Sequence, residues 1–161
     1  MGRRAGRPSL GFFQDGSLPV APVSGRGLCT WRAMTHSPAR ILVVDDNEAL
    51  RENLTEALVL EGYDVAAEPD GEAALRRLER EPFAAVLLDL MMPGLDGREV
   101  LARIRQDARL EHLRVVITTG YSGPTARAGV EPDAFLMKPF GVRELLDALR
   151  RVGLPIAESA A

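Results

Sequence analysis

The chain has 161 residues, 46% of them hydrophobic and 27% charged, a composition that is average for soluble globular proteins and excludes wholesale disorder. Its single cysteine, Cys29, excludes an intramolecular disulfide and a cysteine-based zinc cluster, and its longest apolar run, residues 83–88, is too short to span a membrane. The net charge of −3 combines a formal +4 over residues 1–38 with −7 over residues 39–161. An acidic main part argues against a duplex-DNA footprint, which needs a clustered basic face.

Residues 1–38 differ from the rest of the chain. They hold six glycines and four prolines and show neither a period of 2 nor one of 3.6, so we expect a disordered extension. A secretory signal fits poorly, because polar residues and a proline interrupt the apolar stretch behind the first arginines. Translation that starts at Met34 is an open alternative. We expect the basic charge of this segment to be solvated rather than bound to nucleic acid or membrane.

From Ala39 onward, short apolar runs alternate with amphipathic segments. The apolar runs predict strands over residues 41–44, 63–67, 83–88, 115–118 and 134–137. Apolar residues at helical spacing predict helices from the N-cap Asn47 to Gly62, over residues 71–80, from the loop at 90–97 to about Gln106, and from Val142 to Val152. Glycine and proline in the segment 123–129 leave room for only a weak fourth helix. The alternation predicts an α/β fold in which helices cover both faces of a parallel sheet.

Polar residues close four of the predicted strands. In chain order they are Asp45 and Asp46, Asp89, Thr119 and Lys138. The carboxyl ends of parallel strands share one edge of an open sheet, and ligands bind at that edge. We therefore expect three carboxylates, one hydroxyl and one ammonium group to converge in one crevice.

These residue types together indicate metal-assisted phosphoryl chemistry. Three neighbouring carboxylates repel one another unless a cation lies among them, and oxygen ligands select Mg²⁺ first and Mn²⁺ second. A metal ion, an ammonium and a hydroxyl suit the charged oxygens of an incoming phosphoryl group. Asp89 stands alone at its strand end and is the candidate nucleophile that would form an aspartyl phosphate, whereas Asp45 and Asp46 are better placed as metal ligands.

Four segments resemble the receiver domain of two-component response regulators. They are ILVVDDNE at 41–48, VLLDLMMPGLDG at 86–97, ITTG at 117–120 and FLMKPF at 135–140. The resemblance covers residues 39–153, with the extension 1–38 before it and a tail, 154–161, after it. It implies a flavodoxin-like fold with strand order 2-1-3-4-5 and a single-domain regulator.

The resemblance also implies roles for the acidic residues. Asp89 would be the phosphoacceptor, and Asp45 and Asp46 the acidic pair that holds Mg²⁺ together with Asp89. Met91 would add its backbone carbonyl as a further ligand. Met91 and Tyr121 flank the expected site with bulk and offer no carboxylate or amide to orient a water, so we predict slow self-dephosphorylation.

The remaining site residues are expected to act as a switch. Thr119 would bond a phosphoryl oxygen, and Lys138 would pair with the phosphoryl oxygens or with the free Asp89. Phe135 would be the aromatic residue that turns inward as Thr119 moves. The bond before Pro139 would be cis, which X–Pro bonds permit at modest cost. Thr119 and Lys138 are only 19 positions apart, fewer than the family leads us to expect, so we predict a short fourth helix.

The sequence thus predicts a phosphorylatable signalling switch rather than a turnover enzyme, one that promotes only its own phosphorylation and dephosphorylation. A histidine kinase or histidine phosphotransfer protein would be its donor and an unidentified protein its target. No nucleic acid or membrane partner is expected, and we expect a cytoplasmic monomer or weak dimer. A phosphorylation-independent interaction module and a Mg²⁺-dependent phosphohydrolase remain alternatives. The hydrolase would want a second Asp where Met91 stands.

Overall fold

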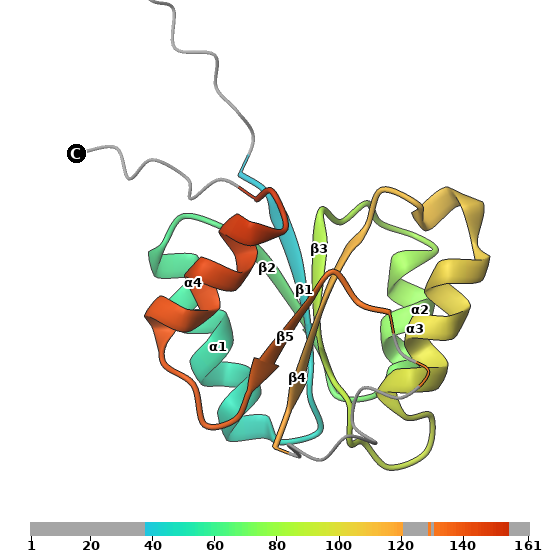
Figure 1. Ribbon diagram of the computed structural model, residues 1–161, viewed down its shortest axis with the longest axis horizontal. Coiled ribbons are helices and arrows are strands. Elements are labelled where there is room, and N and C mark those ends of the chain that lie inside the picture. Colours follow the sequence, from blue (N-terminus) through green and yellow to red (C-terminus); the bar gives the residue numbers. More distant parts are fainter. Residues whose placement is uncertain (1–37, 121–128, 130, 155–161) are drawn as a thin grey trace, which may run out of the picture. The chain divides into compact units, whose positions relative to one another are not determined.

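A computed structural model describes residues 38–120, 129 and 131–154 (Figure 1). The predicted extension, the weak fourth helix, Tyr121 and most of the predicted tail lie outside these residues. Within the described part, strands and helices alternate from Arg40 to Thr119, and one more strand and helix follow between Ala134 and Arg151. None of the helices described there is long and apolar enough to cross a membrane.

The described elements agree with the predicted alternation. The strands are β1 (Arg40–Val44), β2 (Asp64–Glu68), β3 (Ala85–Asp89), β4 (Arg114–Thr119) and β5 (Ala134–Met137). The helices are α1 (Glu48–Leu60), α2 (Gly71–Leu78), α3 (Gly97–Gln106) and α4 (Val142–Arg151), with a 3₁₀ turn, η1 (Ala108–Leu110), after α3.

Several element ends differ by one or two residues from the sequence prediction, and three of the differences are informative. The strand expected from residue 83 begins at Ala85, because Phe83 is buried in the core before the β-ladder starts. The helix expected over 71–80 ends at Leu78, and its C-cap, Glu79, still has a helical backbone conformation. The turn η1 was not predicted, since three polar-flanked residues carry no periodic signal. Apolar content therefore predicts burial better than it predicts the end of an element.

The sheet is parallel throughout, and its strand order β2-β1-β3-β4-β5 confirms the predicted flavodoxin-like topology. In Figure 1, α1 and α4 lie on one face of this sheet and α2 and α3 on the other. The central strands are buried on both faces, which explains why β1 and β3 are almost entirely apolar. All five strands run in one direction, so their carboxyl ends lie at one edge.

Two apolar clusters hold the layers together, and alternate residues of each strand point into opposite clusters. Ile41 and Val43 pack beneath α1 and α4, whereas Leu42 and Val44 pack beneath α2 and α3. All four are at most 1% exposed. Burying one such side chain contributes about 1.5–3 kcal/mol, so these clusters place the strand ends firmly.

Side-chain caps decide where three helices begin. Asn47 accepts a hydrogen bond from the N–H of Leu50 at 3.0 Å, which confirms the predicted N-cap of α1. Asp70 and Asp96 cap α2 and α3 in the same way. Each cap contributes about 1 kcal/mol. Because the caps of α1 and α3 end the loops that follow β1 and β3, they also delimit the loops that carry the site.

Candidate functional site

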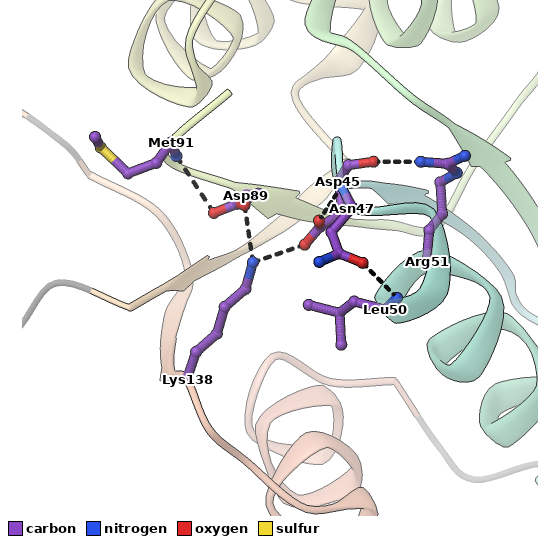
Figure 2. A network of polar contacts seen from close by, with 7 residues as sticks. All are labelled: Asp45, Asn47, Leu50, Arg51, Asp89, Met91 and Lys138. Carbon is purple, nitrogen blue, oxygen red and sulfur yellow. Dashed lines mark hydrogen bonds and ion pairs between the residues drawn. The ribbon is translucent and has the colours of Figure 1, made fainter. Parts of the chain in front are cut away.

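Three of the predicted site residues meet through their side chains at the carboxyl edge of the sheet (Figure 2). The ammonium nitrogen of Lys138 donates to Oδ2 of Asp45 at 2.7 Å and to Oδ2 of Asp89 at 2.8 Å. Asp45 follows β1, Asp89 is the last residue of β3, and Lys138 follows β5. Residues up to 93 positions apart in the chain are thus joined by one cation.

The pocket is buried and short of positive charge. Asp45 is 1% exposed and Asp89 is 5% exposed. Burial raises the pKa of Asp89, and the nearby charge of Asp45 raises it further, although the bonds from Lys138 and the Met91 N–H act in the opposite direction. Burial lowers the pKa of Lys138, but its bonds to both carboxylates outweigh this effect and leave the pKa raised. Two carboxylates share one ammonium, so the pocket can accept another cation.

The acidic residues fit a hard divalent cation. Asp45, Asp46 and Asp89 each offer one carboxylate oxygen, and these oxygens lie within 4.8 Å of one another. Asp46 is exposed, so the cluster opens to solvent on its side. A donor set of oxygens alone suits Mg²⁺ or Mn²⁺. The undercompensated negative charge of the buried pair favours such an ion electrostatically.

Met91 contacts the site through its backbone. Its N–H donates to Oδ1 of Asp89 at 3.3 Å, and its side chain is 64% exposed and points away from Asp89 in Figure 2. The hydrogen bond from the Met91 N–H holds this part of the main chain beside Asp89. The Met91 carbonyl as a metal ligand stays a prediction.

The loop between β1 and α1 is fastened by contacts that the sequence analysis did not identify. The N–H of Asn47 donates to Oδ1 of Asp45 at 2.9 Å, and a guanidinium nitrogen of Arg51 donates to the backbone carbonyl of Asp45 at 2.7 Å. Figure 2 shows both contacts at Asp45. No sequence motif marks an arginine that binds a backbone carbonyl, because every residue carries that acceptor.

Gly97 packs against the backbone of Asp89, the phosphoacceptor candidate, and the sequence analysis assigned this glycine no role. Gly97 is the first residue of α3, and its N–H donates to the carbonyl of Leu90 at 3.1 Å. A Cβ at this position would overlap the carbonyl oxygen of Asp89 and would lie 2.8 Å from Cα of Leu90. Only glycine lets the start of α3 pack this closely against the end of β3.

Of the residues predicted to switch, Thr119 ends β4 and contacts Lys138, whereas Phe135 lies within β5. Thr119 is 1% exposed, and its backbone carbonyl accepts the N–H of Lys138 at 2.8 Å, which ties the end of β4 to the end of β5. Phe135 is partly buried against the cluster beneath α2 and α3. The Lys138–Pro139 peptide bond is cis. The roles of Thr119 and Phe135 in switching stay predictions.

Curated relatives resemble the described domain over most of its length. The response regulator protein FleR of Pseudomonas aeruginosa is 40% identical over 121 residues, which are 72% of this chain and 25% of FleR. The response regulator MprA of Mycolicibacterium vanbaalenii is 40% identical over 116 residues, 70% of this chain and 49% of MprA. The matched region therefore spans a quarter to a half of the length of these curated relatives.

Solved structures share the fold as well. The chemotaxis response regulator CheY4 of Vibrio cholerae superposes with a TM-score of 0.68 at 28% identity, over 71% of this chain and 98% of CheY4. The response regulator TrrA of Thermotoga maritima gives 0.65 at 33% identity, over 71% of this chain and 98% of TrrA. The family model described as "Response regulator receiver domain" matches residues 41–150. Sequence, fold and edge geometry agree, and the chain belongs to the response regulator receiver domain family of two-component systems.

Proposed function

We propose that this chain is a phosphorylatable switch in which Asp89 accepts a phosphoryl group in the presence of Mg²⁺. The observation that carries the proposal is the buried carboxylate pair of Asp45 and Asp89, which shares the single ammonium of Lys138. A structural ion pair needs one carboxylate for one ammonium. A second buried carboxylate is costly unless the pocket serves a further cation.

The residues that would hold Mg²⁺ are Asp45, Asp46 and Asp89, with the backbone carbonyl of Met91 as a further ligand. When bound, the ion would neutralise negative charge on the phosphoryl oxygens. The solved structure of TrrA is a complex with Mg²⁺-BeF, which supports the same chemistry here.

The phosphoryl group would come from a phosphohistidine of a histidine kinase or a histidine phosphotransfer protein. A carboxylate oxygen of Asp89 attacks phosphorus, the P–N bond of the donor breaks, and its electron pair stays on the imidazole nitrogen. The product is an acyl phosphate at Asp89. The ammonium of Lys138, which already lies 2.8 Å from Oδ2 of Asp89, pairs with the phosphoryl oxygens. Asp45 keeps the other contact of that ammonium.

The acyl phosphate would change the surface through two neighbouring residues. The hydroxyl of Thr119 bonds a phosphoryl oxygen, and Phe135 turns inward to fill the space that Thr119 vacates. Thr119 is the last residue of β4, and Phe135 is the second residue of the adjacent strand β5, where it pairs with Ile117. The output is a contact with a downstream protein, made by the receiver domain at residues 39–153.

Intact-mass spectrometry after incubation with acetyl phosphate tests this proposal. The wild type should gain one phosphoryl group when Mg²⁺ is present and none when it is removed by a chelator. Asp89→Asn should gain none, because its carboxamide has no carboxylate oxygen that can attack phosphorus and form the acyl phosphate. Asp96→Asn, which changes a carboxylate at the N-cap of α3, is the matched control and should be labelled like the wild type. Continued labelling of Asp89→Asn would contradict the proposal.

If the wild type gains no mass, beryllofluoride binding distinguishes the remaining functions. Tight Mg²⁺-dependent binding would show that the adduct forms and is lost quickly. An absence of binding would favour the phosphorylation-independent interaction module. Multiple turnovers of p-nitrophenyl phosphate would favour the phosphohydrolase.

We also expect the phosphoryl group on Asp89 to have a long lifetime. The side chain of Met91 is apolar and exposed, so it cannot orient a water for attack on phosphorus. We expect slow loss of the phosphoryl group from the wild type and faster loss from Met91→Asn, whose amide can hold a water. The decay of the labelled mass with time measures both rates. A wild-type half-life of seconds would refute this expectation.

A further inference from the structure

Two of the three clustered carboxylates stand in the loop between β1 and α1, and one arginine of α1 binds the backbone of this loop. The guanidinium nitrogen Nη1 of Arg51 donates to the carbonyl oxygen of Asp45 at 2.7 Å (Figure 2). The contact reaches back over six positions, from the first turn of the helix to the end of β1. Asp45 is 1% exposed, and a buried carbonyl needs such a partner.

This carbonyl controls where the next residue lies. The oxygen of Asp45 belongs to the same planar peptide unit as the nitrogen and Cα of Asp46. Holding the oxygen therefore sets the direction in which the chain leaves the buried Asp45. Asp46 is exposed, so core packing does not hold its side chain, and the backbone is what positions it.

We propose that Arg51 is a positioning residue for the metal site. Through the Asp45 carbonyl it orients Asp46, so that this carboxylate joins those of Asp45 and Asp89. The inference rests on the proposed function, since it concerns how the same site binds Mg²⁺.

Two effects of Arg51 on Mg²⁺ binding oppose each other, and substitutions separate them. The positive charge of a guanidinium repels a divalent cation, so charge alone predicts tighter binding by Arg51→Ala and unchanged binding by Arg51→Lys. Positioning predicts weaker binding by both variants, because an ammonium does not reproduce the planar guanidinium fork. One hydrogen bond corresponds to about two- to tenfold in affinity, which is the loss we expect.

Calorimetric titration of the metal-free protein with Mg²⁺ tests the proposal without a phosphodonor. The variants are Arg51→Ala and Arg51→Lys. The control is Arg143→Ala, which removes the same charge from an exposed position on α4. Both Arg51 variants should bind Mg²⁺ about two- to tenfold more weakly than the wild type. The control should not bind more weakly. In acetyl phosphate labelling, the Mg²⁺ concentration for half-maximal rate should rise, while the rate at saturating Mg²⁺ stays close to that of the wild type.

If Arg51→Ala folds poorly, the NMR spectrum of the metal-free Arg51→Lys variant still tests the proposal. The backbone amide resonance of Asp46 should shift in Arg51→Lys and stay in place in Arg143→Ala. Wild-type affinity in both Arg51 variants, or tighter binding by Arg51→Ala with unchanged binding by Arg51→Lys, would overturn the positioning role alone. If the wild type itself bound no Mg²⁺, the proposed function would fail and this inference with it.

Discussion

Two ion-paired aspartates at opposite edges of the sheet differ in how completely their charge is neutralised. At the carboxyl edge, Asp89 shares the ammonium of Lys138 with Asp45. At the amino edge, Asp133 stands just before β5. It accepts bonds from the N–H of Val115 at 2.7 Å, from Arg105 at 2.7 Å and from Arg114 at 3.3 Å. We call this second group the Asp133 clamp.

The pKa values of the two carboxyls shift in opposite directions. Burial raises the pKa of Asp89, and the bonds from Lys138 and the Met91 N–H do not offset it. Burial also acts to raise the pKa of Asp133, but the Val115 N–H and the guanidinium groups outweigh it and hold the pKa below its usual value. The Asp133 clamp is thus complete in itself. The acidic pocket retains uncompensated negative charge, which favours the binding of a cation there.

Removal of Lys138 should give the largest effect, because it leaves two buried carboxylates without their shared partner. We expect Lys138→Ala to lower the free energy of unfolding by about 3 kcal/mol in the absence of metal. Mg²⁺ should restore part of this loss, since it supplies the missing positive charge. Urea unfolding with and without Mg²⁺ measures both changes. A loss that Mg²⁺ does not reduce would mean that the pocket binds no cation.

Removal of the Asp133 carboxylate should cost less and should not respond to metal. Asp133→Ala removes the acceptor of a backbone N–H and of two guanidinium groups, which we expect to cost about 2 kcal/mol. The control Asp147→Ala breaks an exposed ion pair with Arg150 and should cost less than about 0.5 kcal/mol. The same urea titrations apply. If Mg²⁺ rescued Asp133→Ala as it does Lys138→Ala, the contrast between the two regions would be lost.

The smallest expected effect is the pH dependence of the free energy of unfolding, which has opposite signs for Asp133 and Asp89. The folded pKa of Asp133 is depressed, so its stabilisation is present above the unfolded pKa of about 3.9 and is lost as the pH falls through the folded value. The folded pKa of Asp89 is raised, so its ionised form opposes folding, and stability is lost as the pH rises through that value. At neutral pH, Asp133→Asn should therefore be less stable than the wild type and Asp89→Asn more stable.

Thermal unfolding of both variants over a series of acidic buffers measures this dependence. Each difference from the wild type should shrink toward about pH 4 and below, where the wild-type carboxyls become protonated as well. Equal signs for the two variants at neutral pH would contradict the opposite pKa shifts.

The sequence by itself determined the layers and the main residues of the candidate site. Apolar runs alternate with amphipathic segments, and this pattern admits few arrangements other than a parallel sheet between helices. Because parallel strands end at one edge, the sequence predicts that Asp45, Asp89 and Lys138 lie together. The structure joins these three side chains directly.

Only the tertiary structure decided which backbone groups are contacted at the site and at the opposite edge of the sheet. Arg51 binds the Asp45 carbonyl, Gly97 lies against the Asp89 carbonyl, and Asp133 accepts the Val115 N–H. Every residue carries these backbone groups, so no sequence pattern marks which of them are used. The direction of each pKa shift could not be predicted from the sequence either. It depends on the balance between burial and hydrogen bonds, and the packing of the whole domain sets the burial.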